Sequence, residues 1–379
     1  MCIRDRGITV LIARYLGEKR EDQIGSIIGG GTVVFAAISL VLFVIMVGFA
    51  RPIAVLMQAP EEAVGLTAAY IRICGAGIFF IVAYNVLSAI FRGLGDSNSP
   101  LLFVFVACIV NVVGDLVLVA GLGMDAMGAA LATVFAQALS VVFAIVRLVK
   151  KGLPFTITGY DFRWNPQCGK FLQIGLPLAL QECLTQGSFL ALCAFVNRLG
   201  LEASSGYGVA CKIVNFAMLI PSALMQSTSS FVSQNVGAGE QKRAKKTMFT
   251  GIGIGLLVGC FAFSLVFFRG DLLAGIFSAD AAVVQRGYEY LKGFAPETLL
   301  TAVLFSMMGY FNGNGKTVWV MLQGLIQTLL VRLPFAYYMS IQPDASLTNI
   351  GLAAPISTAV GIVLNVAFFL YLEHAAKRS

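Results

Sequence analysis

The sequence Phe-Arg-Gly-Leu-Gly at residues 91–95 returns as Phe-Asn-Gly-Asn-Gly at residues 311–315, so that residue n is echoed at n + 220. The same offset relates residues 16–31 to residues 236–251. Further identical pairs at this offset are Gly17 with Gly237, Ala54 with Ala274, and Tyr70 with Tyr290. A repeat of this length divides the chain into two homologous halves, and in an apolar chain it is typical of a transporter built from two equivalent bundles.

The composition is that of a chain that lies in lipid. Apolar residues make up 58% of the 379 residues, charged residues make up 12%, and the mean hydropathy is +0.85, whereas a soluble protein averages about 25% charged residues. A helix needs about 20 apolar residues to cross a bilayer. Ten runs satisfy this length: 24–49, 63–91, 100–121, 126–148, 171–197, 203–235, 244–268, 281–311, 317–340 and 348–372.

The repeat also predicts that the first half is incomplete. Two apolar runs, 171–197 and 203–235, precede Gly237, whereas Gly17 lies close to the start of the sequence. We therefore expect a parent protein of six plus six helices, with the first helix and most of the second lying upstream of this sequence. Residues 1–6 carry three charges where an apolar helix is expected, and we interpret them as foreign sequence.

Basic residues predict the orientation of the spans, because loops rich in Lys and Arg are retained in the cytoplasm. One set of alternate loops, which includes Lys150, Lys151, Lys242 and Arg243, holds sixteen basic residues, and the opposite set holds six. Both halves then have the same orientation, which makes them parallel repeats. This topology accounts for the net charge of +7, so the charge is no indication of nucleic-acid binding.

The predicted fold is therefore an all-α integral membrane protein of two parallel-repeat six-helix bundles. The longest polar stretch, residues 149–170, is predicted to be a cytoplasmic linker. It separates an N-terminal lobe at 1–148, which holds the end of helix 2 to helix 6, from a C-terminal lobe at 171–379, which holds helices 7–12.

Several classes of chemistry are excluded by the residues present. The eight cysteines show no Cys-x-x-Cys spacing, and His374 is the only histidine, so neither a histidine metal site nor a Ser-His-Asp triad is expected. The glycine-rich run 251–259 lies inside an apolar span and lacks the Gly-Lys-Ser/Thr ending of a phosphate-binding loop. We expect no cofactor and no ATPase subunit, and transport would be driven by an ion gradient.

Charged residues inside the predicted spans carry the functional signal, because an unpaired charge in lipid is costly. Five lie well inside: Asp115, Glu182, Lys212, Glu297 and Arg332. Asn111 precedes Asp115 by four positions, which places both on one face of a helix. A carboxylate beside an amide can hold Na⁺ or a proton. The alternative interpretation is a polar pair that only bridges two helices.

Four motifs in this order resemble the multidrug and toxic compound extrusion (MATE) family. They are Asn111-x-x-x-Asp115, the Gly-Ala-Ala-x-Ala-Thr sequence of residues 128–133, Gly175-x-Pro177, and the Ser-Gln-Asn-x-Gly-Ala-Gly sequence of residues 233–239. The resemblance covers the chain from Gly7 onward. Each motif alone is weak, but their order and spacing along a two-lobed repeat are fairly specific.

The resemblance implies antiport of cationic amphipathic organic compounds against Na⁺ or H⁺ by alternating access. It implies a multi-pass monomer in the bacterial cytoplasmic membrane. In prokaryotic members the cation site lies in the N-terminal lobe, and the matching positions here are Asn85, Asn111, Asp115 and Thr133. An aspartate of the first helix also belongs to that site, and it falls outside this sequence. No metal is expected beyond Na⁺ at Asp115.

The C-terminal lobe offers Glu182 and Glu297 as further acids. The alternative is that either pairs with Lys212 or Arg332 in a neutral structural network. Prolines in these spans, Pro296 among them, can kink their helices. The two basic residues also keep open a rival function, a flippase of lipid-linked oligosaccharide or peptidoglycan precursor from the same superfamily. From other classes, an intramembrane enzyme or a purely structural membrane protein would be the alternatives.

Overall fold

The computed structural model describes residues 4–20, 23–56, 61–151 and 159–378, and this part of the chain contains helices and no strands. Residues 1–3 of the stretch interpreted as foreign, and residues 152–158 of the predicted linker, lie outside the described residues. Within those residues, eight helical stretches are long and apolar enough to span a membrane, and two bent helix pairs raise the number to ten. The prediction of an all-α membrane protein is confirmed, and the ten stretches match the ten predicted runs.

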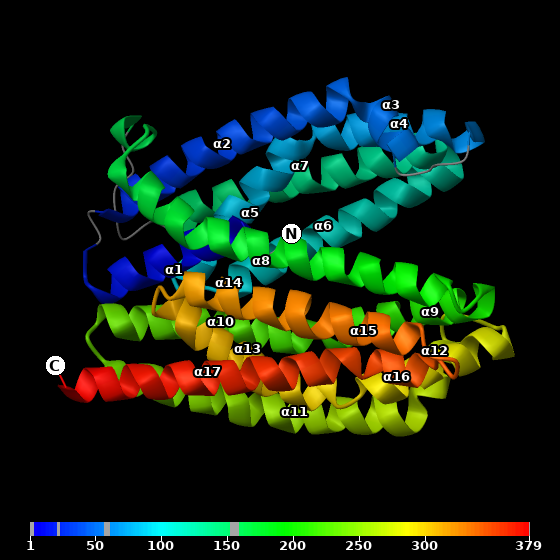
Figure 1. The fold of residues 1–379 in the computed structure, drawn as a ribbon. Helices are drawn as coiled ribbons and strands as arrows, with labels where there is room; N and C mark the ends of the chain where they lie inside the picture. Colours follow the sequence, from blue (N-terminus) through cyan, green and yellow to red (C-terminus); the bar gives the residue numbers. More distant parts are fainter. Residues whose placement is uncertain (1–3, 21–22, 57–60, 152–158, 379) are drawn as a thin grey trace. The chain divides into compact units, whose positions relative to one another are not determined.

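The chain divides into two compact units, Met1–Gly175 and Leu176–Ser379. The first is built from helices α1 to α7 and the start of α8 (Figure 1). Helix α5 packs against α1, α2 and α7, and α6 packs along α7. The bounds are α1 Arg4–Gly17, α2 Ile24–Gly48, α3 Ala50–Leu56, α4 Glu61–Ala76, α5 Ile78–Gly93, α6 Asn98–Asp115, the π-helix η2 Leu116–Gly121, α7 Asp125–Lys151, the short 3₁₀-helix η3 Gly159–Asp161 and α8 Pro166–Asn197.

The second unit continues from α8 and places α13 in contact with α10, α11 and α17 (Figure 1). Its helices are α9 Leu201–Ala217, α10 Leu219–Gly237, α11 Gln241–Gly275, α12 Ala281–Phe294, α13 Glu297–Gly313, α14 Thr317–Leu325, the π-helix η4 Ile326–Arg332, α15 Leu333–Ser340, α16 Leu347–Gly351 and α17 Ala353–Arg378.

The repeat in the sequence is a repeat in the backbone. After α5, Gly95 has φ +81° and the N–H of Asp96 donates to Phe91 O at 2.9 Å. After α13, Gly315 has φ +75° and the N–H of Lys316 donates to Phe311 O at 2.8 Å. Glycine is favoured at such a helix end because a positive φ crowds a Cβ atom. The two Gly-x-Gly sequences therefore end two equivalent helices with the same turn.

Two predicted spans, 63–91 and 281–311, are not straight. The pairs α4/α5 and α12/α13 are each bent by 48°. In the second unit Pro296 lies in the break, where it can donate no backbone hydrogen bond. In the first unit the break lies at Gly77, where an added Cβ would stand 2.3 Å from Val134 Cγ2 on α7. The same bend thus coincides with a proline in one half and with a close approach of α7 in the other.

Large apolar side chains remain exposed on the outer faces of both units. On α6, Leu101 and Phe105 are exposed by 68% and 61%, and on α11, Leu257 and Phe261 are exposed by 75% and 71%. Exposed apolar faces this extensive are unfavourable in water and favourable in lipid. Their exposure agrees with the apolar composition of a chain that lies in a membrane.

Candidate functional site

The first candidate site lies where α6 packs on α7. The amide nitrogen Nδ2 of Asn111 donates to Thr133 Oγ1 at 3.3 Å, and that hydroxyl donates to Ala129 O at 2.9 Å. The two helices approach closely here, since a Cβ added to Gly114 would lie 2.9 Å from Ala132 Cβ. The structure therefore brings Asn111 and Thr133 together as direct neighbours.

Asp115 stands one turn beyond Asn111, at the last residue of α6. Its Oδ1 atom is buried and has no hydrogen-bond partner. Beyond it the backbone widens into the π-helix η2, where the N–H of Leu122 reaches back to Val117 O at 3.0 Å. A π-helical turn inside an α-helix is rare and is often found at functional sites. The sequence analysis did not predict it.

Asn85 belongs to α5, which also packs against α7. Its side chain is 6% exposed, and its Nδ2 donates to Ile81 O of the same helix at 2.8 Å. Among the described residues no hydrogen bond joins Asn85 to Asn111, Asp115 or Thr133. Of the four predicted positions, the structure joins two directly, places Asp115 one turn away and leaves Asn85 on a neighbouring helix.

The second candidate site is a chain of hydrogen bonds that starts at Glu297, the first residue of α13. Thr358 Oγ1 of α17 donates to Glu297 Oε1 at 2.9 Å, and Gln327 Nε2 of η4 donates to Thr358 Oγ1 at 3.1 Å. Gln323 Nε2 donates in turn to Gln327 Oε1 at 2.5 Å. The other carboxylate oxygen, Glu297 Oε2, is buried without a partner. Side chains from separate helices thus converge on one buried acid.

Gln323, Gln327 and Thr358 were missed by the sequence analysis. Gln323 and Gln327 are four positions apart, which is the same spacing that singled out Asn111 and Asp115. That spacing was the available signal for the two glutamines. Thr358 lies on a distant helix, and only the packing of α17 on η4 brings it to them.

Arg332 ends η4 close enough to Glu297 for the two charges to interact. Its guanidinium carbon lies 4.4 Å from the centre of the Phe189 ring, and its Nε is buried without a hydrogen bond. A cation over an aromatic face is stabilised by the ring quadrupole. Among the described residues Arg332 forms no ion pair with either glutamate.

Glu182 and Lys212 lie apart from this chain of hydrogen bonds. Glu182 accepts from Gln186 Nε2 one turn along α8 at 3.2 Å. Its neighbour Gln181 is the residue that packs on α14, since a Cβ at Gly324 would lie 3.0 Å from Gln181 Cγ. The exposed Lys212 side chain extends over the Phe277 ring at 5.6 Å.

Each candidate site is built around a single carboxylate. No group of three or more His, Cys, Asp or Glu residues that could hold a metal occurs among the described residues. Among the described residues, each unit has one acid, Asp115 or Glu297, with one buried oxygen left without a partner. Neutral amides and hydroxyls accompany each acid, Asn111 and Thr133 in the first unit and Gln327 and Thr358 in the second.

Comparison with known proteins agrees with this architecture. The family model named MatE matches residues 5–117 and 177–338, which is more than half of the chain. The chain is 27% identical to the "Probable multidrug resistance protein YpnP" of Bacillus subtilis (strain 168), over 75% of this chain and 64% of that protein. It is 26% identical to the "Multidrug export protein MepA" of Staphylococcus aureus (strain NCTC 8325 / PS 47), over 84% and 72% of the two chains.

Among solved structures, the chain resembles one described as the outward-facing conformation of a multidrug resistance MATE family transporter of the MOP superfamily. The TM-score is 0.94 at 20% sequence identity, covering all of this chain and 85% of that one. At this identity the likeness establishes the fold alone.

Proposed function

This chain belongs to the MATE family of multi-pass membrane transporters, and we propose from that premise that it exports cationic amphipathic organic compounds in exchange for Na⁺ or H⁺. The proposal includes a bacterial cytoplasmic membrane location and a monomer that works by alternating access without an ATPase subunit. The names of the relatives, which describe multidrug resistance and export, support the substrate class.

The observation that carries the proposal is the buried, unpartnered Oδ1 of Asp115 beside the Asn111–Thr133 pair. A buried carboxylate without a partner is costly and gains from a cation or a proton. Because Nδ2 of Asn111 is engaged by Thr133, its oxygen is the side of the amide available to a cation. Asn85 and the Glu297 cluster are further positions at which the coupling ion would act.

The mechanism follows from the charge on these acids. Binding of Na⁺ or H⁺ neutralises an acid and favours the conformation in which that acid is buried, whereas the organic cation favours the state in which the acid is charged and open. A ligand shifts a conformational equilibrium only through its different affinity for the two states. Ion and drug therefore exchange because they compete for the same negative charge.

Inverted membrane vesicles with a fluorescent organic cation added to the outside solution test this function. An imposed Na⁺ gradient and an imposed pH gradient, applied separately, identify the coupling ion. Asp115→Asn should abolish gradient-driven uptake, while Asp125→Asn, a change of an exposed acid in the same unit, should leave it intact. Undiminished transport by Asp115→Asn would reject the coupling role.

The rival flippase function requires basic groups free to bind a pyrophosphate. Lys212 is exposed beside Phe277, and the charge of Arg332 acts on Glu297. The interaction of the Arg332 charge with Glu297 favours export of organic cations over movement of a pyrophosphate-linked lipid. Transport of a fluorescent lipid-linked precursor in the same vesicles, without transport of the dye, would reverse the assignment.

A further inference from the structure

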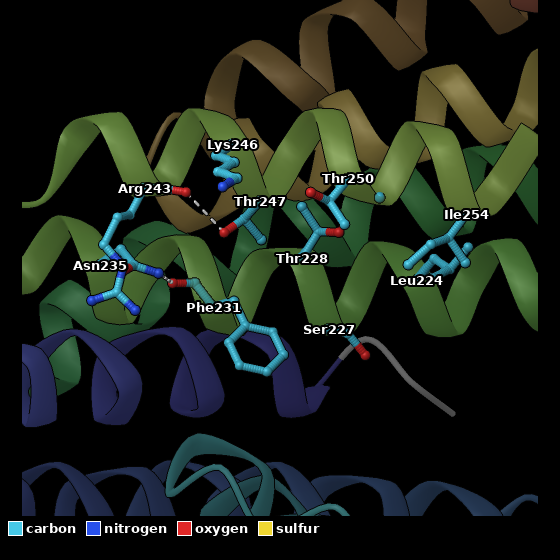
Figure 2. Close-up of a pocket in the computed structure, with 11 residues that line it drawn as sticks. Leu224, Ser227, Thr228, Phe231, Asn235, Arg243, Lys246, Thr247, Thr250 and Ile254 are labelled. Atoms are coloured by element: carbon cyan, nitrogen blue, oxygen red, sulfur yellow. Dashed lines mark hydrogen bonds between the residues drawn. The ribbon is translucent and has the colours of Figure 1, made fainter.

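A groove of about 490 Å³ lies between α10 and α11 in the second unit. Figure 2 shows its side chains on the two helices, with Arg243 beside Asn235 at one end and Leu224 near Ile254 at the other. Apolar residues line much of it, and Arg243 and Lys246 supply positive charge. Neither basic residue forms an ion pair within the described part of the chain.

The repeat identifies an equivalent groove in the first unit, between α1 and α2. Leu11 and Val34 of the first unit correspond at the repeat offset to Phe231 and Ile254 of the second. The first two are each 4% exposed, whereas Phe231 and Ile254 are 57% and 52% exposed. The same apolar positions are thus covered in one half and open in the other.

In the first unit the cover is the segment 159–171, and its apolar contacts are specific. A Cβ at Gly7 would lie 2.8 Å from Phe171 Cε2, and a Cβ at Gly30 would lie 2.8 Å from Cys168 Sγ. Phe171 also packs edge-on against Phe35, with ring centres 5.2 Å apart. The segment therefore fills the space between α1 and α2 and joins their hydrophobic core.

Two polar contacts of this segment are made with Ser26, which corresponds to Lys246. Ser26 Oγ donates to Asp161 Oδ1 at 2.8 Å, and Asn165 Nδ2 donates to Ser26 O at 2.9 Å. The carboxylate of Asp161 thus contacts the residue of the first unit that corresponds to Lys246 of the second unit. An acid beside Lys246 would gain a charge-assisted bond where Ser26 provides only a hydroxyl.

We propose that the α10/α11 groove is the docking site of a polypeptide segment built like residues 159–171, with a carboxylate that reaches Lys246 and an aromatic ring that packs over Ser227. The segment would cover the α10/α11 groove in the way that residues 159–171 cover the equivalent groove of the first unit.

A synthetic peptide of residues 159–175 tests the groove on the purified 379-residue chain in detergent. The labelled peptide should bind, as measured by fluorescence anisotropy, and Lys246→Glu should weaken binding at least tenfold. Lys242→Glu makes the same charge change on the same helix outside the groove and should leave binding unchanged. A peptide carrying Asp161→Lys should restore binding to the Lys246→Glu chain.

Disulfide trapping tests which residue of the groove lies next to Cys168 of the bound peptide. Cys168 of the peptide should form a disulfide with Thr250→Cys much faster than with Gly253→Cys, because Thr250 corresponds to Gly30 and Gly253 has open space around it. Absence of binding, or equal binding and trapping in all variants, would overturn the proposal. Displacement of the peptide by phosphatidylglycerol vesicles in a Lys246-dependent manner would also overturn it, by assigning the groove to an anionic lipid.

Discussion

Gly77 and Glu297 occupy equivalent positions in the two halves, each at a 48° bend between two helices. At Gly77 the missing side chain lets α7 approach, and at Glu297 the bend presents a buried acid to Thr358. The two equivalent bends thus differ, because helices pack closely at Gly77 and a charged side chain is buried at Glu297. The two halves thus differ in chemistry at this pair of equivalent positions.

The first prediction concerns the close approach at Gly77. Gly77→Ala should destabilise the protein by about 1–3 kcal/mol, because its Cβ would overlap Val134 and force a packed helix to shift. The loss of stability is measured as a lower unfolding temperature in detergent, with size-exclusion chromatography monitoring the folded fraction. Gly65→Ala, which has open space around its Cβ, is the control and should leave the unfolding temperature close to that of the parent.

The second prediction concerns Asp96, in the loop before α6. Lys151 Nζ and the Ser99 N–H and hydroxyl all donate to its carboxylate. Partial burial acts to raise the pKa of Asp96, but these hydrogen bonds outweigh it and lower the pKa from 3.8 to about 2. The folded-state pKa is below the unfolded one, so the ionised group stabilises the protein above about pH 4 and this stabilisation is lost as the pH falls towards 2.

Asp96→Asn should therefore lower stability by about 1 kcal/mol at pH 7, since Lys151 is partly exposed and the pair is screened by solvent. The difference in unfolding temperature between parent and variant should shrink as the pH is lowered from 5 to 3. The control is Asp344→Asn, which makes the same change at an exposed aspartate. A difference that stays constant over this pH range would contradict the assigned role of the ion pair.

The third prediction concerns Thr358, which links Glu297 to Gln327. Thr358→Val should cost about 1–3 kcal/mol, because Glu297 Oε1 and Gln327 Nε2 both lose their partner in a buried environment. Thr358→Ser keeps the hydroxyl and should recover most of the stability. Equal unfolding temperatures for the valine and serine variants would show that the hydroxyl does not support the cluster.

More of the scaffold than of the candidate site could be predicted from the sequence. The hydrophobic runs and the internal repeat predicted all ten spans, because both depend on residue order alone. A kink at Pro296 followed from the proline itself, whereas the bend at Gly77 was not predicted, since no proline marks it and the approach of Val134 is a tertiary contact. The π-helix after Asp115 leaves no recognisable pattern of residues, and it also escaped prediction.

The candidate site shows the same division. The Asn111 and Asp115 pair followed from helical spacing, while Asn85 and Thr133 entered only through a family resemblance. The structure joins Thr133 to Asn111 and leaves Asn85 bonded to its own helix. The Glu297 cluster depends on the contacts that α17 makes with α13 and with η4, and Thr358 on α17 lies 61 residues from Glu297. Local spacing predicts partners on one helix, and tertiary packing selects partners on the others.

The fourth prediction separates an ion-binding role of Thr133 from a purely structural one. Its hydroxyl holds the amide of Asn111, so Thr133→Val should release that amide and raise the Na⁺ or proton concentration needed for half-maximal exchange about tenfold, the effect of a lost interaction of about 1.4 kcal/mol. Vesicle transport measured over a series of ion concentrations gives this value. Thr133→Ser keeps the hydroxyl and should exchange at the parent concentration. A lower maximal rate at an unchanged half-maximal ion concentration would instead place Thr133 in the packing of α6 on α7.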